Sequence, residues 1–558
     1  MTKNKLIIAV ESAILAEFSV HETVELTRPE AKFGDYACNV AMKLSKQLQK
    51  KPREIAEAIK YALSDNELIE SIDIAGPGFL NFKLNDETLW KEATRSTELV
   101  YQDENIVTEY SDPNVMKDLH AGHLYTTIVG DVISRLIEKG GASVHRTNFG
   151  GDVGLHVAKA MWGILQELGS ESPDSLNEIP NETRTVWLSQ CYVAGVTAYD
   201  EDETAKNEIM DLNKRIYQIH EDSDKASDLA LIYWTTREWS YDGFKKLYDR
   251  LEVTPFERYY PESITTPPGL AAVKAGLEKG IFKESDGAIV YKGEDKGLHT
   301  RVFLNSQGLP TYEAKDLGLT YRKWEDYSYE QNVIITGNDI TEYMKVVLAA
   351  LAELLPETEG RTTHLTHGMI KMKGGVKMSS RKGNVLRGVD MIDSAEKAAQ
   401  ASRENETQPA WLAIGALKYS LLKQRIGGDI IYDPEDSVSL EGNSGPYLMY
   451  AHARASSILR KAEDDSVIES YDFESAERTM VQQLSQYAET VEHAMQSYEP
   501  HHICTYLYET SQVFNRFYEN NKVIGSARQA IRIAIVKRYK QVIAESLELL
   551  GIHAPESM

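Results

Sequence analysis

The clearest structural pattern in the chain lies in the stretch NIVTEYSDPNVMKDLHAGHLYTTIVGDVISRLIEKGGASVHRTNF, residues 105–149. It opens with a short β-rich run and a loop. Residues 120–140 then have the spacing of an amphipathic helix that ends at two glycines, and residues 143–149 favour a second strand. Strand, loop, helix and strand form a βαβ unit, and such units build parallel sheets.

A second set of the same kind follows later in the chain. The strand-like NVIIT is followed by the helical ITEYMKVVLAALAELL and the strand-like HLTHGMIKM, within residues 332–372. The two sets predict one Rossmann-like, doubly wound parallel sheet over residues 105–395. An acid-rich, mostly helical insertion is expected at about residues 165–285.

The flanking regions differ from this centre. Residues 1–95 alternate helical and extended patterns, which predicts a small N-terminal α/β domain. Beyond residue 400 the strand patterns end, so residues 400–558 are expected to form an all-helical C-terminal domain.

Composition excludes several classes of protein. The 558 residues are 42% hydrophobic and carry a formal charge of −24, so a disordered chain is excluded and any nucleic-acid contact needs a local basic surface. The three cysteines, Cys38, Cys191 and Cys504, lie far apart, which excludes a disulfide framework and a cysteine-rich zinc site. No apolar run suits a signal peptide or a membrane span, so a cytoplasmic protein is expected.

The motif HAGH, His120 to His123, stands at the predicted strand-to-helix junction. The start of a helix after the first parallel strand favours an anion. Two imidazoles three residues apart share one helix face and can donate to phosphate oxygens. Gly122 leaves room beside the backbone. Alternatively, these are surface histidines beside a turn.

A cationic loop follows the last predicted strand. KMKGGVKMSSRKGNVLR, residues 371–387, has six basic residues and no acidic one. Mobile lysines suit a triphosphate whose charge must be neutralised as a bond breaks. Alternatively, the loop is a solvated or RNA-binding surface.

A basic and aromatic stretch lies near the C-terminus. Residues 515–541 hold seven basic residues and one acidic residue, with aromatic rings between them. Positive charge for phosphates and rings for unstacked bases favour single-stranded RNA, although an amphipathic helix with a solvated basic face has the same composition.

Together these motifs resemble the class I aminoacyl-tRNA synthetases. HAGH is similar to that class's HIGH signature and KMSSR to its KMSKS signature. Within the class the chain resembles the arginyl-tRNA synthetase family, on FGDYACNVAMKLSK, GPGFLNFKL, YSDPNVMKDLHAGHLYTTIVGD, TYEAKDLGL and EGNSGPYLMYAHARASSILRK. The resemblance implies ATP-dependent attachment of L-arginine to tRNA(Arg) through an arginyl-adenylate.

The resemblance also implies roles for individual residues. Arginine would be bound by Glu109, Asn114, His123, Tyr312 and Asp316, since a guanidinium needs carboxylates and an aromatic face. ATP would be bound by His120, Gly122, His123, Lys377, Met378, Ser379, Ser380 and Lys382. The residues expected to act in catalysis are His120, His123, Lys377 and Lys117. The tRNA would contact Arg516, Phe517, Tyr518, Arg528 and Arg532.

Two features depart from the family pattern. The fourth residue of KMSSR is Ser380 where the family has lysine, so Lys117 or Lys382 is expected to replace that charge. The glutamine that some members use for arginine has no clear match near Gly337. We expect Mg²⁺ to accompany ATP, no protein-bound structural metal, and a monomer.

Two other readings of the sequence remain open here. The same nucleotidyl-transfer fold could serve another amino acid or a small adenylyl transfer, which amino-acid-dependent pyrophosphate exchange would distinguish. A non-catalytic RNA-binding relative is the third reading, but it would not be required to keep both histidines, Lys377, Tyr312 and Asp316 together.

Overall fold

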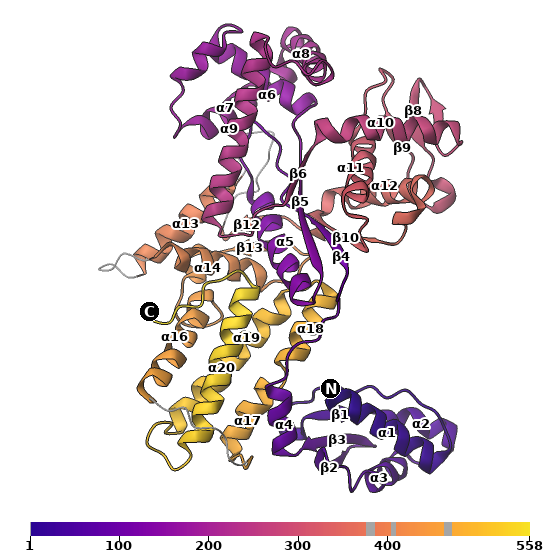
Figure 1. Cartoon of the computed structure of the whole chain (residues 1–558), viewed down its shortest axis with the longest axis vertical. Helices are drawn as coiled ribbons and strands as arrows, with labels where there is room; N and C mark the ends of the chain where they lie inside the picture. The colour runs from indigo at the N-terminus through magenta and orange to yellow at the C-terminus, as the bar shows by residue number, and fades with distance from the viewer. Residues whose placement is uncertain (1, 375–385, 403–408, 463–470) are drawn as a thin grey trace.

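The computed structural model describes residues 2–374, 386–402, 409–462 and 471–558. Figure 1 shows a small N-terminal domain at one end, a central parallel sheet with two lobes beyond it, and a bundle of long helices between the sheet and the N-terminal domain. The predicted fold class is confirmed.

The N-terminal domain is a three-stranded antiparallel sheet covered by helices. Its strands run in the order β1-β3-β2, and the Gly-Pro-Gly turn joins β2 to β3. Helices α2 and α3 pack on this sheet, and α1 packs on α3. The bounds are α1 Thr2–Phe18, β1 Tyr36–Cys38, α2 Val40–Leu48, α3 Pro52–Ala62, β2 Ile69–Ala75, β3 Phe79–Leu84 and α4 Asp86–Ala93.

The central sheet has five parallel strands in the order β11-β10-β4-β5-β6. Its middle strands are apolar and buried, as strands covered on both faces must be. Helix α5 packs on β4, β5 and β10, while α11 packs on β4 and α12 on β11. The bounds are β4 Asn105–Glu109, α5 Ala121–Lys139, β5 Ser143–Gly150, β6 Arg258–Pro261, α11 Tyr312–Tyr327, β10 Gln331–Gly337, α12 Thr341–Leu354 and β11 Thr362–His367.

The insertion differs from the predicted one. Strand β6 lies inside the range predicted as an insertion, and it pairs with β5 at the edge of the sheet. The insertion is therefore two separate lobes, one before and one after β6, as Figure 1 shows. The first holds α6 Leu155–Leu168, α7 Arg184–Glu201, α8 Glu203–Glu221 and α9 Asp228–Arg250; the second holds α10 Glu262–Glu278 and the antiparallel strands β7 Lys283–Ser285, β8 Ala288–Tyr291 and β9 Arg301–Leu304.

The described part of the C-terminal region is helical apart from one short strand. Strand β13 pairs in parallel with β12, so the region predicted to be all-helical supplies a short strand beside the catalytic domain. Helix α20 packs against α16, α17 and α19. The bounds are β12 Ile370–Met372, α13 Gly388–Ala401, α14 Ala410–Leu422, β13 Ile430–Tyr432, α15 Pro434–Ser437, α16 Gly445–Ala462, α17 Ser475–Leu484, α18 Tyr487–Ser497, α19 His501–Asn520 and α20 Gln529–Leu549.

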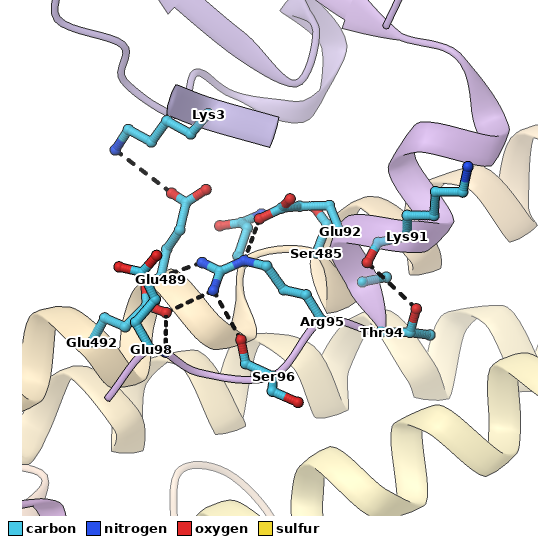
Figure 2. Close-up of polar contacts among 12 residues, drawn as sticks. Lys3, Lys91, Glu92, Thr94, Arg95, Ser96, Glu98, Ser485, Glu489 and Glu492 are labelled. Carbon is cyan, nitrogen blue, oxygen red and sulfur yellow. Dashed lines mark hydrogen bonds and ion pairs between the residues drawn. The ribbon is translucent and has the colours of Figure 1, made fainter. Parts of the chain in front are cut away.

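Ion pairs join the N-terminal domain to the helical domain. Figure 2 shows the Arg95 guanidinium between the carboxylates of Glu92 and Glu492. Arg95 donates to Glu492 through two nitrogens, at 2.6 and 3.0 Å, and to Glu92 at 2.5 Å. Nearby, Arg28 donates to Glu489 at 2.8 Å. These contacts are largely buried, so they fix how the two domains dock.

We expect the Arg95→Ala substitution to loosen this docking by about 3 kcal/mol, because it leaves the buried Glu92 carboxylate and Glu492 without their cation. The thermal unfolding midpoint should fall, and proteolysis between residues 94 and 104 should be faster. Arg53→Ala is the matched control, since Arg53 and Glu57 form an exposed pair whose loss costs less than about 1 kcal/mol. Equal effects of the two substitutions would contradict the docking role.

Candidate functional site

The two histidines of HAGH cap the helix that follows the first strand of the sheet. The Nδ1 atom of His120 accepts from the backbone N–H of Gly122 at 3.1 Å and of His123 at 3.4 Å. In return, the Nδ1 atom of His123 accepts from the backbone N–H of His120 at 3.3 Å. Because both Nδ1 atoms accept, each neutral ring carries its proton on Nε2. The pair therefore offers two N–H donors beside the start of α5.

These imidazoles are neutral at physiological pH. Burial lowers the pKa of His120 to about 4, and burial with His120 and Lys117 nearby lowers the pKa of His123 well below its usual range. The rings stack with centroids 3.7 Å apart, which two cations would not favour. They can hold phosphate oxygens as hydrogen-bond donors, while positive charge must come from other residues.

Gly122 does more than leave room beside the backbone. A Cβ atom there would lie 2.8 Å from the His120 ring, so the glycine lets that ring fold over the helix N-terminus. The sequence predicts Gly122 as part of the ATP site, and the structure places it directly under the capping imidazole.

The residues that directly follow position 385 of the basic loop pair with the backbone around HAGH. Residues 375–385, which include Lys377, Met378, Ser379, Ser380 and Lys382, lie outside the described residues. Immediately after them, the backbone of Leu386 accepts from Ala121 at 2.8 Å, and Gly388 donates to Leu119 at 2.7 Å. The segment that follows the second signature is thus paired with the first.

The loop between β4 and α5 is strained and firmly held. Ser111, Asp112 and Met116 have positive φ angles of 76°, 45° and 61°. Two backbone groups fix the loop: Val115 donates to Gly151 at 3.0 Å, and Met116 donates to Ser240 Oγ at 2.8 Å. Strain of this kind persists only where the surroundings enforce it, and it collects at functional sites.

This loop carries two of the predicted residues. Asn114 lies over Gly151, where a Cβ atom would come within 2.1 Å of its Oδ1. Lys117 has its ammonium 5.4 Å from the Tyr192 ring centroid, and burial lowers its pKa. In addition to burial, the charge of Lys117 lowers the pKa of both His120 and His123, which places Lys117 close to these two rings. This position suits the predicted role of replacing the lysine that the KMSSR signature lacks.

Glu109 ends β4 at the predicted place, but it is not a free carboxylate. Its Oε2 accepts from the Lys323 ammonium at 2.5 Å, and both side chains are at most 4% exposed. Lys323 also donates to Asn332 at 2.8 Å. Glu109 therefore stands at the end of β4 already paired with a buried cation from α11, and its contact with arginine stays a prediction.

Asp316 is the carboxylate best placed to meet a cation. It lies on α11, and its Oδ2 accepts from the Tyr343 hydroxyl of α12. Burial raises its pKa to about 8, and the neighbouring Glu109 contributes to the increase. An uncompensated buried carboxylate is costly, and an incoming guanidinium would remove that cost.

Tyr312 starts α11 one turn before Asp316. Its side chain is 57% exposed, so the ring is available at the surface of the site and not packed in the core. Lys315 lies 5.3 Å from its centroid and is paired with the buried Glu262. The structure thus brings Tyr312 and Asp316 together on one helix, as predicted.

Sequence reasoning missed several residues of the site. Asp112 is half-buried, and its pKa is raised well above the usual range by desolvation and by the neighbouring Glu109. His367 ends β11 at the carboxyl edge of the sheet, where polar residues often act, so this signal was present in the sequence. The sequence around Tyr343 does not predict a role in the site, because its partner Asp316 lies on a different helix.

The predicted tRNA-binding residues separate into two groups. Arg516 and Tyr518 are exposed on α19. Phe517 is 3% exposed and belongs to the core, so it cannot stack on a base in this arrangement. Arg528 and Arg532 are both paired with the buried Glu477, at 2.5 and 2.9 Å. Successive residues of a helix point about 100° apart, so residues 516 and 518 flank the buried residue 517 and reach solvent on either side of it.

A doubly wound parallel sheet with paired histidines at the helix after its first strand, joined to a lysine-rich signature, defines a class I aminoacyl-tRNA synthetase. Comparison with known families agrees: residues 87–432 match the family described as "tRNA synthetases class I (R), catalytic domain". Residues 3–84 match the arginyl tRNA synthetase N terminal domain, and residues 448–558 match the DALR anticodon binding domain. The chain belongs to the arginyl-tRNA synthetase family, and the resemblance predicted from its motifs is confirmed.

Individual relatives extend over the whole chain. The arginine–tRNA ligase of Crocosphaera subtropica is 31% identical, covering 97% of this chain and 96% of the relative. That of Alcanivorax borkumensis is 29% identical over the full length of both. The solved structure of Thermus thermophilus arginyl-tRNA synthetase shares the fold, with a TM-score of 0.82 at 24% identity over both full chains. Within the described part of the chain, none of the helices has the length and hydrophobicity that crossing a membrane requires.

Proposed function

We propose that this chain attaches L-arginine to tRNA(Arg) in two steps, with the residue roles set out below. In the first step the arginine carboxylate attacks the α-phosphorus of ATP, and pyrophosphate leaves. The nucleophile is already ionised, so no general base is needed, and catalysis depends on positioning and on charge stabilisation. In the second step a hydroxyl at the 3′ end of tRNA displaces AMP from the activated carbonyl.

The nucleotide is assigned to the helix start. His120 and His123 donate their Nε2–H groups to phosphate oxygens. Lys117 supplies positive charge beside them, together with Lys377 and Lys382 of the basic loop, and Gly122, Met378, Ser379 and Ser380 complete the ATP site. Magnesium enters with ATP as part of the substrate.

Arginine is assigned to the start of α11, where Tyr312 and Asp316 lie one turn apart. Asp316 pairs with the guanidinium, Tyr312 covers its face, and Asn114 with His123 holds the α-amino end. Glu109 remains at the end of β4 as a partner of Lys323. The single observation that supports this assignment is the half-buried Asp316 carboxylate, which accepts from the Tyr343 hydroxyl and has no ion-pair partner among the described residues.

The tRNA-binding residues are assigned from their exposure on the helical domain. Arg516 and Tyr518 are proposed to contact tRNA, within the region that matches the DALR anticodon binding domain. We propose that the enzyme acts as a monomer in the cytoplasm. The cysteines support a reducing compartment, because Cys38, Cys191 and Cys504 are all free and buried.

The test is charging of total tRNA by the purified chain with ATP and labelled amino acids. L-arginine should be attached, whereas L-lysine and L-citrulline should not. Citrulline has nearly the shape of arginine but no charge, so it isolates the guanidinium–Asp316 contact. Absence of arginine charging, or equal charging with citrulline, would contradict the proposal.

A further inference from the structure

The turn between α18 and α19 gathers metal-binding groups far from the site described above. Glu499 lies in the turn, and His501 and His502 are the first two residues of α19. One carboxylate oxygen and one nitrogen from each imidazole all lie within 4.8 Å of one another. The turn itself is well defined, since His502 donates its backbone N–H to the Glu499 carbonyl at 3.3 Å.

We propose that Glu499, His501 and His502 bind a divalent transition metal, of which Zn²⁺ is the representative ion. Imidazole nitrogens favour zinc and its neighbours over magnesium or calcium, which prefer all-oxygen sites. Two imidazoles and one carboxylate give a three-ligand set, and water completes a tetrahedral shell. The separated cysteines exclude only a cysteine-rich zinc site, whereas this ligand set is built from two histidines and a glutamate.

The spacing of the donor atoms fits a metal ion. His502 Nε2 and Glu499 Oε2 are 3.0 Å apart. Ligands of tetrahedral zinc, with bonds of about 2.0 Å, are separated by about 3.3 Å. A small adjustment therefore brings these two atoms to ligand distance.

An unsatisfied atom points to the same conclusion. His501 Nδ1 is buried and has no hydrogen-bond partner among the described residues. A buried polar atom without a partner is costly and requires an explanation. A metal ion shared with His502 and Glu499 would supply the missing partner.

The surroundings set the expected strength of binding. Arg425 donates to the other side of Glu499, at 2.9 Å to Oε1, and so orients the carboxylate from outside the ligand set. Its charge and the N-terminus of α19 oppose a cation, so we expect micromolar affinity and not the tighter binding of a closed structural site. Arg425 is 76% exposed and can turn into solvent. The exposed His493 has its ring centroid 4.4 Å from that of His502, close enough to become a fourth ligand.

The turn lies next to contacts between the helical domain and the catalytic domain. Directly before Glu499, the Tyr498 hydroxyl donates to Gln331 Oε1 at 2.7 Å, at the start of β10. The Tyr101 hydroxyl donates to the Met495 carbonyl of α18 at 2.9 Å. A bound ion would therefore stiffen the junction between the helical domain and the catalytic sheet.

The test uses the full-length chain without a histidine tag, freed of metal by a chelator. Titration calorimetry with ZnCl₂ should show one equivalent bound, and the ion should raise the thermal unfolding midpoint. His501→Ala and Glu499→Gln should each weaken binding at least about tenfold and lose the thermal shift. His299→Ala is the matched control, because His299 is exposed and belongs to a different lobe.

Cobalt provides a second readout that does not depend on stability. Co²⁺ bound in a tetrahedral nitrogen and oxygen shell absorbs visible light, so the wild-type chain should show this band and the Glu499→Gln chain should not. Circular dichroism verifies that each variant is folded. The proposal is overturned if the wild-type chain takes up no Zn²⁺ at micromolar concentrations, or if the variants bind it as the wild type does.

Discussion

The Asp316→Asn substitution is expected to raise the KM for arginine ten- to a hundred-fold and to leave the KM for ATP nearly unchanged. The lost interaction is a charge-assisted hydrogen bond to a half-buried carboxylate, worth about 1.5–3 kcal/mol. Asparagine has the shape of the protonated carboxyl that burial already favours, since the pKa of Asp316 is raised to about 8. The substitution should therefore preserve the fold, and the effect should be confined to substrate binding.

A control for this substitution lies on the same helix. Asp326 also accepts a tyrosine hydroxyl, from Tyr260 at 2.5 Å, but it sits at the far end of α11. Asp326→Asn should leave both KM values within about twofold of the wild type. If Asp316→Asn has no larger effect on arginine than Asp326→Asn, Asp316 is not a guanidinium ligand.

The raised pKa of Asp316 also predicts how arginine binding depends on pH. The guanidinium stays charged throughout, and it binds the ionised carboxylate. With a pKa of about 8, roughly a tenth of Asp316 is ionised at pH 7 and about three quarters at pH 8.5. The KM for arginine should thus fall about eightfold as the pH rises between these values. The same measurement on the Asp316→Asn chain should be flat, and a parallel slope would assign the titration to another group.

The parts of the site that the sequence predicts correctly are those governed by local rules. A strand ending at Glu109, a loop and a helix beginning after His120 follow from periodicity and glycine positions over one continuous stretch. Tyr312 and Asp316 share a helix, so their spacing alone places them together. These predictions need no knowledge of what the rest of the chain does.

The parts that the sequence could not supply depend on distant partners. Lys323 lies two turns after Asp316 on the same helix, so the sequence spacing alone places it on the same side of α11. Its pairing with Glu109 depends on how α11 packs on β4, which the sequence does not show. Strand β6 was missed because it is short and ends in proline, which is tolerated at the edge of a sheet. Arg528 and Arg532 looked free for RNA because Glu477, their partner, lies on another helix.

The largest effect is expected at the helix cap. His120→Asn should lower kcat for arginine-dependent pyrophosphate exchange about a hundred-fold, the usual loss when one preorganised donor to developing charge is removed. Asparagine can still accept the backbone N–H groups at the start of α5, so it keeps the cap that His120 Nδ1 provides. It is too short to replace the Nε2–H donor. The loss should therefore fall on kcat, with little change in thermal stability.

Two companion substitutions separate capping from catalysis. His120→Ala removes both functions, and it should lower stability by about 1 kcal/mol in addition to the loss of rate. His145→Asn is the control, because His145 lies in the first half of β5, where it pairs with Glu257 at 2.9 Å and stacks on Tyr327. Since the pKa of His120 is already about 4, the wild-type rate should not decline between pH 6 and 8 through titration of this ring in the free enzyme. A His120→Asn enzyme with wild-type kcat would mean that the ring serves only as a helix cap, and the positive charge of Lys117 and the basic loop would then have to stabilise the phosphates alone.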